Sequence, residues 1–217
     1  MIDLYSSGKG IPFVFQGAYY PKMYSKLKAS NLVQLAGAIE KADKYSIFYH
    51  IFHPIFTSHL VAEDLPNDFA VWIDQSLGLR ELAEKIADIP GAEPRDAEDV
   101  RKELIEIINS YKSVREGLRP FVFVSCYPIV YDTGKRASTL AEFLDTIATI
   151  DPRAIVWHFV SKRILGMSKK NDFSAWLEEN FGLTDVASKL SIIDPQTYTD
   201  EERLRDDIIQ TLEGELL

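Results

Sequence analysis

The sequence predicts an α+β protein, mainly helical, made of two tandem repeats with pseudo-two-fold symmetry and a small antiparallel sheet. The first observation is a motif, Asn67-Asp68-Phe69-Ala70-Val71-Trp72, which recurs 104 positions later as Asn171-Asp172-Phe173-Ser174-Ala175-Trp176. The second is Pro12-Phe13-Val14-Phe15, which recurs 108 positions later as Pro120-Phe121-Val122-Phe123. We therefore expect a first repeat over residues 11–113, a second over 119–217, and a polar, flexible N-terminal arm over 1–10.

The segments that begin at Pro12 and Pro120 predict the strands. Both are rich in aromatic and β-branched residues, which is typical of buried strands. Each is too short to be stable as an isolated hairpin, so we expect the two to pair with each other across the pseudo-two-fold axis. Pro21 and Pro128 predict a bend or a sheet edge. Thr133-Gly134 predicts a turn.

About five helices are expected in each repeat. Asn31 and Thr139 begin capping-box patterns, in which the first side chain and the one three positions later satisfy each other's backbone amides. The next helix of each repeat contains His50 or His158 and is apolar on nearly every side, which predicts deep burial. Pro54 is expected to end or kink the first of these helices.

The repeated motif predicts a helix start. Its Asn is a favourable N-cap, and its Asp suits the positive end of the helix dipole. Its two aromatic residues fall on one face, where they would anchor the helix to the core. The residues concerned are Asn67, Asp68, Phe69, Trp72 and their partners Asn171, Asp172, Phe173, Trp176.

With its paired Pro-Phe-x-Phe, aromatic-His and Asn-Asp-Phe-x-x-Trp segments, the chain resembles a family of uncharacterised prokaryotic proteins that is known only as a domain of unknown function. The resemblance covers nearly the whole chain. It implies a cytoplasmic prokaryotic protein, and it brings no activity, cofactor or catalytic residue with it.

Composition excludes several classes of function. The chain has 217 residues with 24 basic and 33 acidic side chains, a net charge of −9, which argues against binding duplex nucleic acid. We expect no membrane span, and the lone Cys126 indicates a reducing, cytoplasmic location. No cofactor motif is present, and Gly8-Lys9-Gly10 lacks the spacing of a phosphate loop.

His50 and His158 are the two histidines that the repeats share. They could form a general base pair or donate to a ligand, since histidine titrates near neutral pH. Alternatively, they are core residues hydrogen-bonded to a carbonyl group or an aspartate. Arg101 and Arg205 could clamp an anion, or form ion pairs that tie the last helix to the motif helix. Cys126 aligns with Ala18, which indicates that Cys126 is a small buried residue.

The repeats differ in length and charge only over residues 51–66 and 159–170, which we expect to be loops. The second segment carries the basic residues Lys162, Arg163, Lys169 and Lys170, candidates for binding an acidic partner or a phosphate group. The first carries His53, His59, Glu63 and Asp64. A metal site there is disfavoured, because the spacing matches no standard set of ligands.

No stretch of sequence establishes an activity. The leading hypothesis is a non-enzymatic cytoplasmic module that binds or regulates a partner protein. The alternative is a small-molecule-binding protein or enzyme with a cleft between the repeats near His50 and His158. We expect no nucleic-acid or membrane partner, and the sequence does not determine an oligomeric state.

Overall fold

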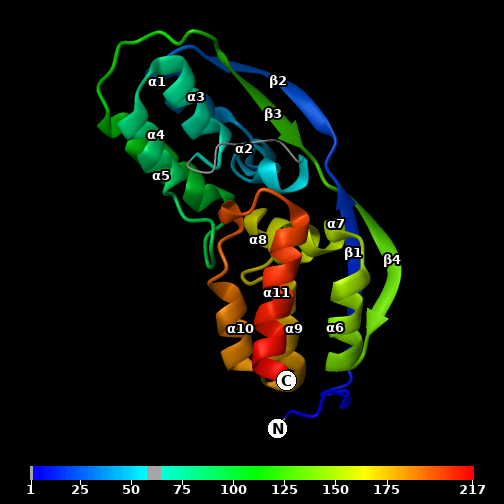
Figure 1. Cartoon of the computed structure of the whole chain (residues 1–217). Coiled ribbons are helices and arrows are strands. Elements are labelled where there is room, and N and C mark those ends of the chain that lie inside the picture. The colour runs from blue at the N-terminus through cyan, green and yellow to red at the C-terminus, as the bar shows by residue number, and fades with distance from the viewer. Residues whose placement is uncertain (1, 58–64) are drawn as a thin grey trace.

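The computed structural model describes residues 2–57 and 65–217, and helices dominate the architecture (Figure 1). The elements follow in the order β1 (Phe13–Tyr19), β2 (Lys22–Ala29), α1 (Leu32–Lys41), α2 (Lys44–Thr57), α3 (Asp68–Leu77), α4 (Arg80–Ala87), α5 (Ala97–Ser110), β3 (Phe121–Cys126), β4 (Ile129–Ala137), α6 (Leu140–Thr149), α7 (Pro152–Val156), the π-helical turn η1 (Trp157–Ser161), α8 (Lys162–Ile164), α9 (Asp172–Phe181), α10 (Thr184–Ser191), the 3-10 turn η2 (Pro195–Thr197) and α11 (Glu201–Leu216). Among the described residues, no helix combines the length and apolarity needed to cross a bilayer.

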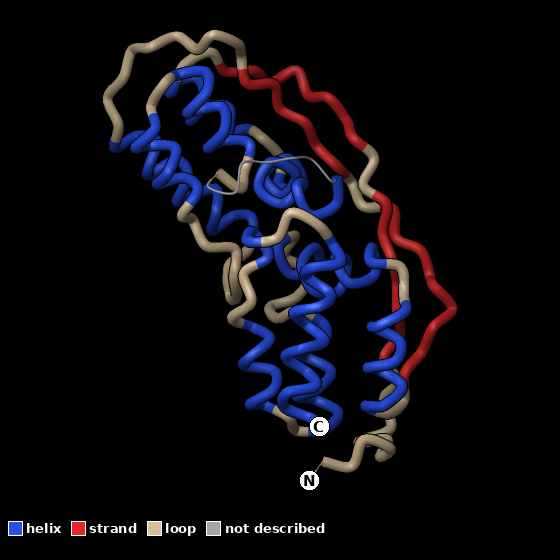
Figure 2. Tube along the Cα trace, in the orientation of Figure 1, coloured by secondary structure: helices blue, strands red, loops and turns tan. Residues whose placement is uncertain are grey.

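The helices form two clusters, and the strands run along one side of both (Figures 1 and 2). β1 pairs antiparallel with β4, and β2 pairs antiparallel with β3. We call α1–α5 with β2 and β3 the N-terminal lobe, and α6–α11 with β1 and β4 the C-terminal lobe. The four strands together are the ribbon. The α+β, mainly helical class predicted from the sequence is confirmed.

The lobes are offset from the sequence repeats by one strand. β1 comes first in the chain but packs on α7 and η1 of the C-terminal lobe, whereas β3 follows the last helix of the N-terminal lobe and packs on α2. The chain therefore passes between the lobes at Pro21 and again at Pro128. Each proline lies between two strands, where its missing amide interrupts no ladder hydrogen bond.

Two bulges curve the ribbon. In β4, residues 133–135 lie opposite the single residue Phe15, and in β2, residues 25–27 lie opposite Phe123. The turn predicted at Thr133-Gly134 is therefore wrong, because Gly134 adopts a φ of 75° inside a strand. Extra residues on one strand bend a ribbon, which lets a two-stranded element follow both lobes.

The predicted helix starts are confirmed. Asn31 accepts from the Gln34 amide, and Thr139 forms a complete capping box with Glu142. Asn67 and Asn171 cap α3 and α9 by accepting from the amides of Ala70 and Ser174. Both motif helices end at a left-handed glycine, Gly78 or Gly182.

The segments in which the repeats differ are more ordered than expected. Residues 51–57 belong to α2, and 159–164 continue the helix from η1 into α8, so the loop prediction is wrong for both stretches. Pro54 lies inside α2 and does not end it, because burial of this apolar helix outweighs one lost hydrogen bond. His59, Glu63 and Asp64 lie outside the described residues.

The N-terminal arm packs on the C-terminal lobe, contrary to the predicted flexible segment. The Ala141 amide donates to the Leu4 carbonyl at 3.0 Å, and the Lys9 amide donates to the Asn180 carbonyl at 3.0 Å. Ile2 and Leu4 also pack against the core, and this apolar contact fixes an otherwise polar segment.

We predict that Trp72→Ala lowers the free energy of unfolding by about 3–5 kcal/mol, as large aromatic truncations in cores do. Trp72 is 9% exposed and Trp176 is 7% exposed, so Trp176→Ala should cost a similar amount. Chemical denaturation measures both, with the fully exposed Val114→Ala as the control. A loss below about 1 kcal/mol would mean that the tryptophans serve recognition at the surface instead.

Candidate functional site: the ribbon and its anchors

A histidine–aspartate pair anchors β1 to the C-terminal lobe. His158 Nδ1 lies 2.6 Å from Asp172 Oδ2, and His158 Nε2 accepts from the Gln16 amide at 2.8 Å. A backbone amide can only donate, so Nε2 is the acceptor and Nδ1 carries the proton that points to the carboxylate. Both ring nitrogens are therefore engaged: Nε2 holds a strand from the other sequence repeat, and Nδ1 faces the aspartate of its own repeat.

The N-terminal lobe holds β3 in the same way. His50 Nδ1 lies 2.7 Å from Asp68 Oδ2, and His50 Nε2 accepts from the Val124 amide at 2.9 Å. Both histidines are at most 3% exposed. This arrangement leaves neither ring a free nitrogen for proton transfer or metal coordination.

Burial and charge act in opposite directions at the C-terminal anchor. Burial lowers the pKa of His158, although the Asp172 carboxylate partly offsets that effect. Burial alone would raise the pKa of Asp172, but hydrogen bonds from His158 and Lys162 outweigh it and hold the pKa below its usual value. The pair is therefore a neutral imidazole beside a carboxylate at neutral pH.

The aromatic residues of each motif complete the anchor. The Phe13 ring of β1 lies 5.4 Å from Phe173 and 5.7 Å from Trp176. In the N-terminal lobe the Phe121 ring of β3 lies 5.0 Å from Phe69 and 5.8 Å from Trp72. Such pairs add specific geometry to the burial of apolar surface.

The tryptophan indoles bond to the chain just before each strand. Trp176 Nε1 donates to the Ile11 carbonyl at 2.8 Å, and Trp72 Nε1 donates to the Arg119 carbonyl at 2.7 Å. These bonds satisfy an indole N–H that burial would otherwise leave unpaired.

The motif asparagines reach the opposite lobe as well as capping their helices. Asn171 Nδ2 donates to Glu93 Oε1 at 2.7 Å, across to the loop that precedes α5. Asn67 Nδ2 lies 3.5 Å from Gln196 Oε1, in the 3-10 turn η2 that precedes α11. The asparagine and both aromatic residues of the motif therefore contact a segment from the other repeat, whereas the aspartate acts through its histidine.

The two anchors differ in one further partner. Lys162 Nζ donates to Asp172 Oδ2 at 2.6 Å, whereas His53 Nδ1 lies 3.4 Å from Asp68 Oδ2. The π-helical turn η1 adds one residue, so the offset between the two helices changes from 108 to 109 and His53 becomes the counterpart of Lys162.

Arg163 lies in the core between the lobes. It is 2% exposed, and its guanidinium donates to the Gly91 carbonyl at 2.7 Å and the Arg95 carbonyl at 2.5 Å. Glu93 Oε1 lies 3.9 Å from its Nε. Arg163 therefore holds the loop before α5 against the C-terminal lobe.

The other basic candidates occupy different surroundings. Lys170 pairs with Glu178, and Lys169 is exposed. Thus Lys162, Arg163 and Lys170 have partners within the chain, and the four basic residues do not form one open patch. That they bind a partner stays a prediction.

Arg101 and Arg205 tie their helices to a neighbour other than the motif helix. Arg101 pairs with Glu98 and donates to the Ile39 carbonyl, near the end of α1. Arg205 pairs with Glu202 and donates to the Ile150 carbonyl, at the end of α6. The predicted ion pair with the motif helix is wrong, because the carbonyl groups at a helix end offer a closer acceptor.

Cys126 is not a reactive thiol, and the described His, Cys, Asp and Glu side chains form no metal site. Burial raises the pKa of the Cys126 thiol to about 12, which keeps it protonated and unreactive. Within residues 2–57 and 65–217, no three His, Cys, Asp or Glu side chains gather as a metal site would require.

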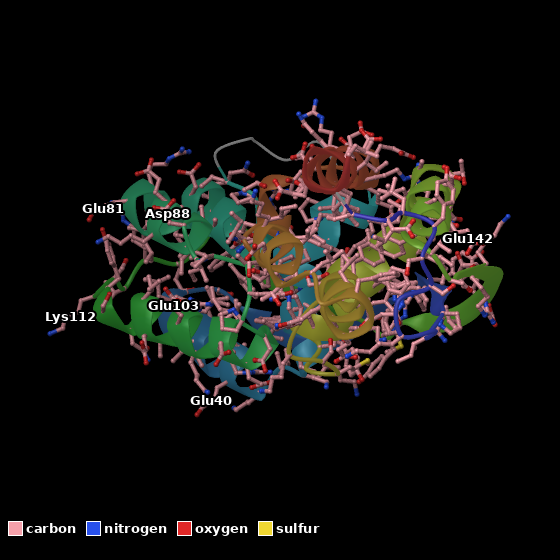
Figure 3. The ribbon with its side chains drawn as sticks, turned by 90° about the horizontal axis from the view of Figure 1, so that it is seen from below. Glu40, Glu81, Asp88, Glu103, Lys112 and Glu142 are labelled. Carbon is pink, nitrogen blue, oxygen red and sulfur yellow. The ribbon has the colours of Figure 1, made fainter. Side chains whose placement is uncertain are left out.

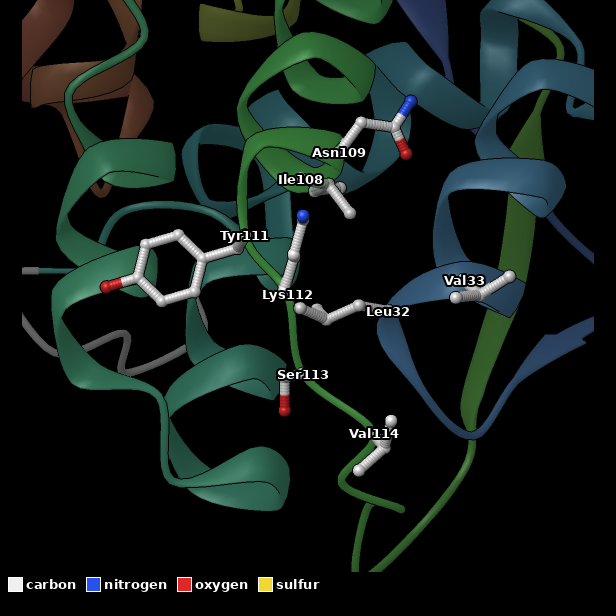
Figure 4. Close-up of a pocket in the computed structure, with 8 residues that line it drawn as sticks. All are labelled: Leu32, Val33, Ile108, Asn109, Tyr111, Lys112, Ser113 and Val114. Atoms are coloured by element: carbon white, nitrogen blue, oxygen red, sulfur yellow. The ribbon is translucent and has the colours of Figure 1, made fainter.

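Of three surface grooves, one adjoins the N-terminal anchor, because Asp68, the partner of His50, lines it. A groove of about 400 Å³ between α1 and the end of α5 (Figure 4) is lined by Leu32, Val33, Ile108, Asn109, Tyr111, Lys112, Ser113 and Val114. A groove of about 310 Å³ lies between α3 and β3, and another of about 710 Å³ lies between α10 and α11. Neither His50 nor His158 lines any of these three, so they form no shared cleft here.

The middle of the ribbon carries an apolar surface that we call the crown: Tyr19, Pro21, Met23, Tyr127, Ile129 and Tyr131. Alternate residues of a strand share a face, so Ile129 and Tyr131 of β4 face the same way, and Tyr19 of β1 lies opposite Ile129 on that face. Pro21 and Tyr127 lie between strands, and Met23 lies at the start of β2. The Tyr19 and Tyr131 rings are 5.0 Å apart, and Tyr131 covers Gly17, where any side chain would collide with it.

The crown is exposed although it is apolar. Tyr19, Met23, Tyr127 and Ile129 are between 41% and 59% exposed. The Arg153 guanidinium lies 5.1 Å from the centre of the Tyr19 ring, and Tyr45 packs 4.3 Å from Tyr127. In the sequence, this surface is visible as apolar residues at alternate positions around Pro21 and Pro128. From sequence alone, such residues are expected to be buried in the core.

We predict that replacing His158 with glutamine weakens the pH dependence of stability. The folded pKa of His158 is lowered, so its contribution is complete above the unfolded pKa of about 6.5 and is lost as pH falls below it. Urea denaturation at pH 7.5 and 5.5 should show a larger loss on acidification in the wild type than in His158→Gln. Equal losses would contradict this assignment.

We also predict that Arg163→Met lowers the free energy of unfolding by about 3–5 kcal/mol, because it leaves Glu93 buried without its cation. The matched variant Lys169→Met removes an exposed cation and should change stability by less than about 0.5 kcal/mol. Thermal and chemical denaturation compare the two. Similar effects would refute the assignment of Arg163 to the contact between lobes.

Comparison with known proteins places the chain in a family. The solved structure of OrfY from Thermoproteus tenax is 47% identical, covers 98% of each chain and superposes with a TM-score of 0.94. None of the curated proteins matches the chain. A family profile matches residues 10–213, and the chain therefore belongs to the family of unknown function DUF5752.

Proposed function

We propose that this protein is a non-enzymatic interaction module that binds a partner protein on the crown. The observation that carries the proposal is the exposure of Tyr19, Met23, Tyr127 and Ile129 near the middle of the ribbon, where the two strand pairs meet. Tyrosine and methionine are enriched at protein interfaces, where they bury large areas at modest entropic cost. Clustered exposed apolar residues on a folded protein mark interaction sites.

The anchors support this function by holding the crown rigid. His50 and His158 each fix one of the two strand pairs of the ribbon, through the Val124 amide of β3 and the Gln16 amide of β1. A surface that is ordered before binding loses less conformational entropy when the partner arrives. A binding site mounted on such a scaffold is also more specific than one on a free loop.

The alternative, an enzyme or small-molecule-binding protein, depended on His50 and His158 being accessible to a ligand. His50 and His158 each use both ring nitrogens in the anchors, and they line none of the three surface grooves. A general base needs access to the proton that it removes. A module whose histidines serve the fold is the simpler account.

We further infer that the chain arose by tandem duplication. The paired anchors support this origin, because His50 and His158 make equivalent bonds to Asp68 and Asp172. The paired bulges opposite Phe15 and Phe123 support it as well.

We predict that the double variant Met23→Ser and Ile129→Ser loses the partner and keeps its stability. Tagged protein incubated with native extract should retain a partner that the variant does not, and mass spectrometry identifies what is bound. The matched control is Val114→Ser with Leu118→Ser, which removes two apolar side chains that are 99% and 84% exposed elsewhere. Retention of the same partner by the crown variant would refute the proposal.

A further inference from the structure

We propose that the partner presents an acidic, extended segment, which adds to the free edge of β2 and places an apolar side chain on the crown. This inference rests on the proposed function and specifies the chemistry of the partner. Its basis is the distribution of charge, the unpaired edge of β2 and the position of β2 beside the crown.

Charge is segregated between the ribbon and the rest of the molecule. Residues 13–29 and 121–137 contain five cations (Lys22, Lys26, Lys28, Lys135 and Arg136) and one anion, Asp132, a net charge of +4. The whole chain carries −9, so the remainder carries −13. Figure 3 shows Glu40, Glu81, Asp88, Glu103 and Glu142 at the periphery of the helices. The ribbon is therefore a basic strip on an acidic body.

Most of these ribbon cations are available to a partner. Arg136 pairs with Asp132 at 2.7 Å, and Lys22 Nζ lies 5.7 Å from the centre of the Tyr49 ring, whereas Lys26, Lys28 and Lys135 are exposed and form no ion pair with any described residue. Lysines on an edge strand also prevent uncontrolled pairing with other strands. These lysines would repel a basic strand and attract an acidic one, so their charge discriminates between partners.

The backbone of β2 offers hydrogen bonds to such a segment. β2 pairs with β3 on one side, and over the described residues no strand pairs with its other edge. Met23 belongs to the crown, and its neighbour Tyr24 is 79% exposed. An added strand obtains affinity from main-chain bonds and specificity from alternate side chains.

A second copy of the chain fits this surface poorly. Two crowns face to face would bring the two +4 ribbons together, which is unfavourable. A ribbon docked on the acidic helices of another copy is a head-to-tail contact, which propagates unless its rotation closes a ring.

A nucleic acid also fits less well than a short acidic segment. Its phosphates continue beyond the ribbon and would meet the acidic helical body. Single-stranded RNA is nevertheless a competitor, because exposed tyrosines can stack with bases.

The test measures fluorescence anisotropy of a labelled peptide of alternating Glu and Val, with the alternating Lys and Val peptide and a uridine oligonucleotide as comparison probes. The wild type should bind the acidic peptide, more weakly as salt rises, and bind the other two at least tenfold more weakly. Lys26→Glu with Lys28→Glu should weaken acidic-peptide binding at least tenfold. The matched control, Lys41→Glu with Lys102→Glu, reverses two exposed cations on helices and should leave it unchanged.

Equal effects of the two double variants, or preference for either comparison probe, would overturn this inference. If the acidic peptide does not bind but the crown variant still loses its partner from extract, the inference fails while the interaction function stands. If the crown variant also keeps its partner, both fail.

Discussion

The fold depends on a histidine that accepts from a strand amide with one ring nitrogen and faces an aspartate with the other. His50 and His158 each do this, and each holds a strand from the opposite sequence repeat. A buried imidazole with a free nitrogen would cost stability, and a buried strand edge would too. Bringing the two together satisfies both, and the aspartate fixes the tautomer that makes this possible.

The repeated motif follows from the same constraint. Its asparagine caps the helix and reaches the other lobe, its aspartate holds the histidine, and its aromatic residues pack against the exchanged strand. Each lobe therefore lacks part of its core until a strand from the other repeat arrives. Arg163 also joins the two lobes through its bonds to the loop before α5.

Symmetry in the anchors contrasts with asymmetry around them. One extra residue in η1 places Lys162 where the N-terminal lobe has His53, and it directs Arg163 into the contact between lobes. The ribbon is symmetric, because its bulges and prolines lie at equivalent positions in the two repeats. Its centre is apolar and exposed. The ribbon is also a basic strip on an acidic body.

Local pattern in the sequence determined the helix starts and the mainly helical class, because capping and apolar periodicity act over a few residues. The two strand segments were expected to pair in a single small sheet, whereas they form two two-stranded sheets, β1 with β4 and β2 with β3. The motif residues were visible too, but their partners were not. Only the tertiary structure decided that β1 lies on the C-terminal lobe, that Arg163 is buried and that Tyr19 and Ile129 are exposed. Apolar side chains at alternate positions look alike whether a strand faces a core or solvent. The physical reason is that the lobe on which a strand packs determines which face of that strand is buried, and this packing is long-range.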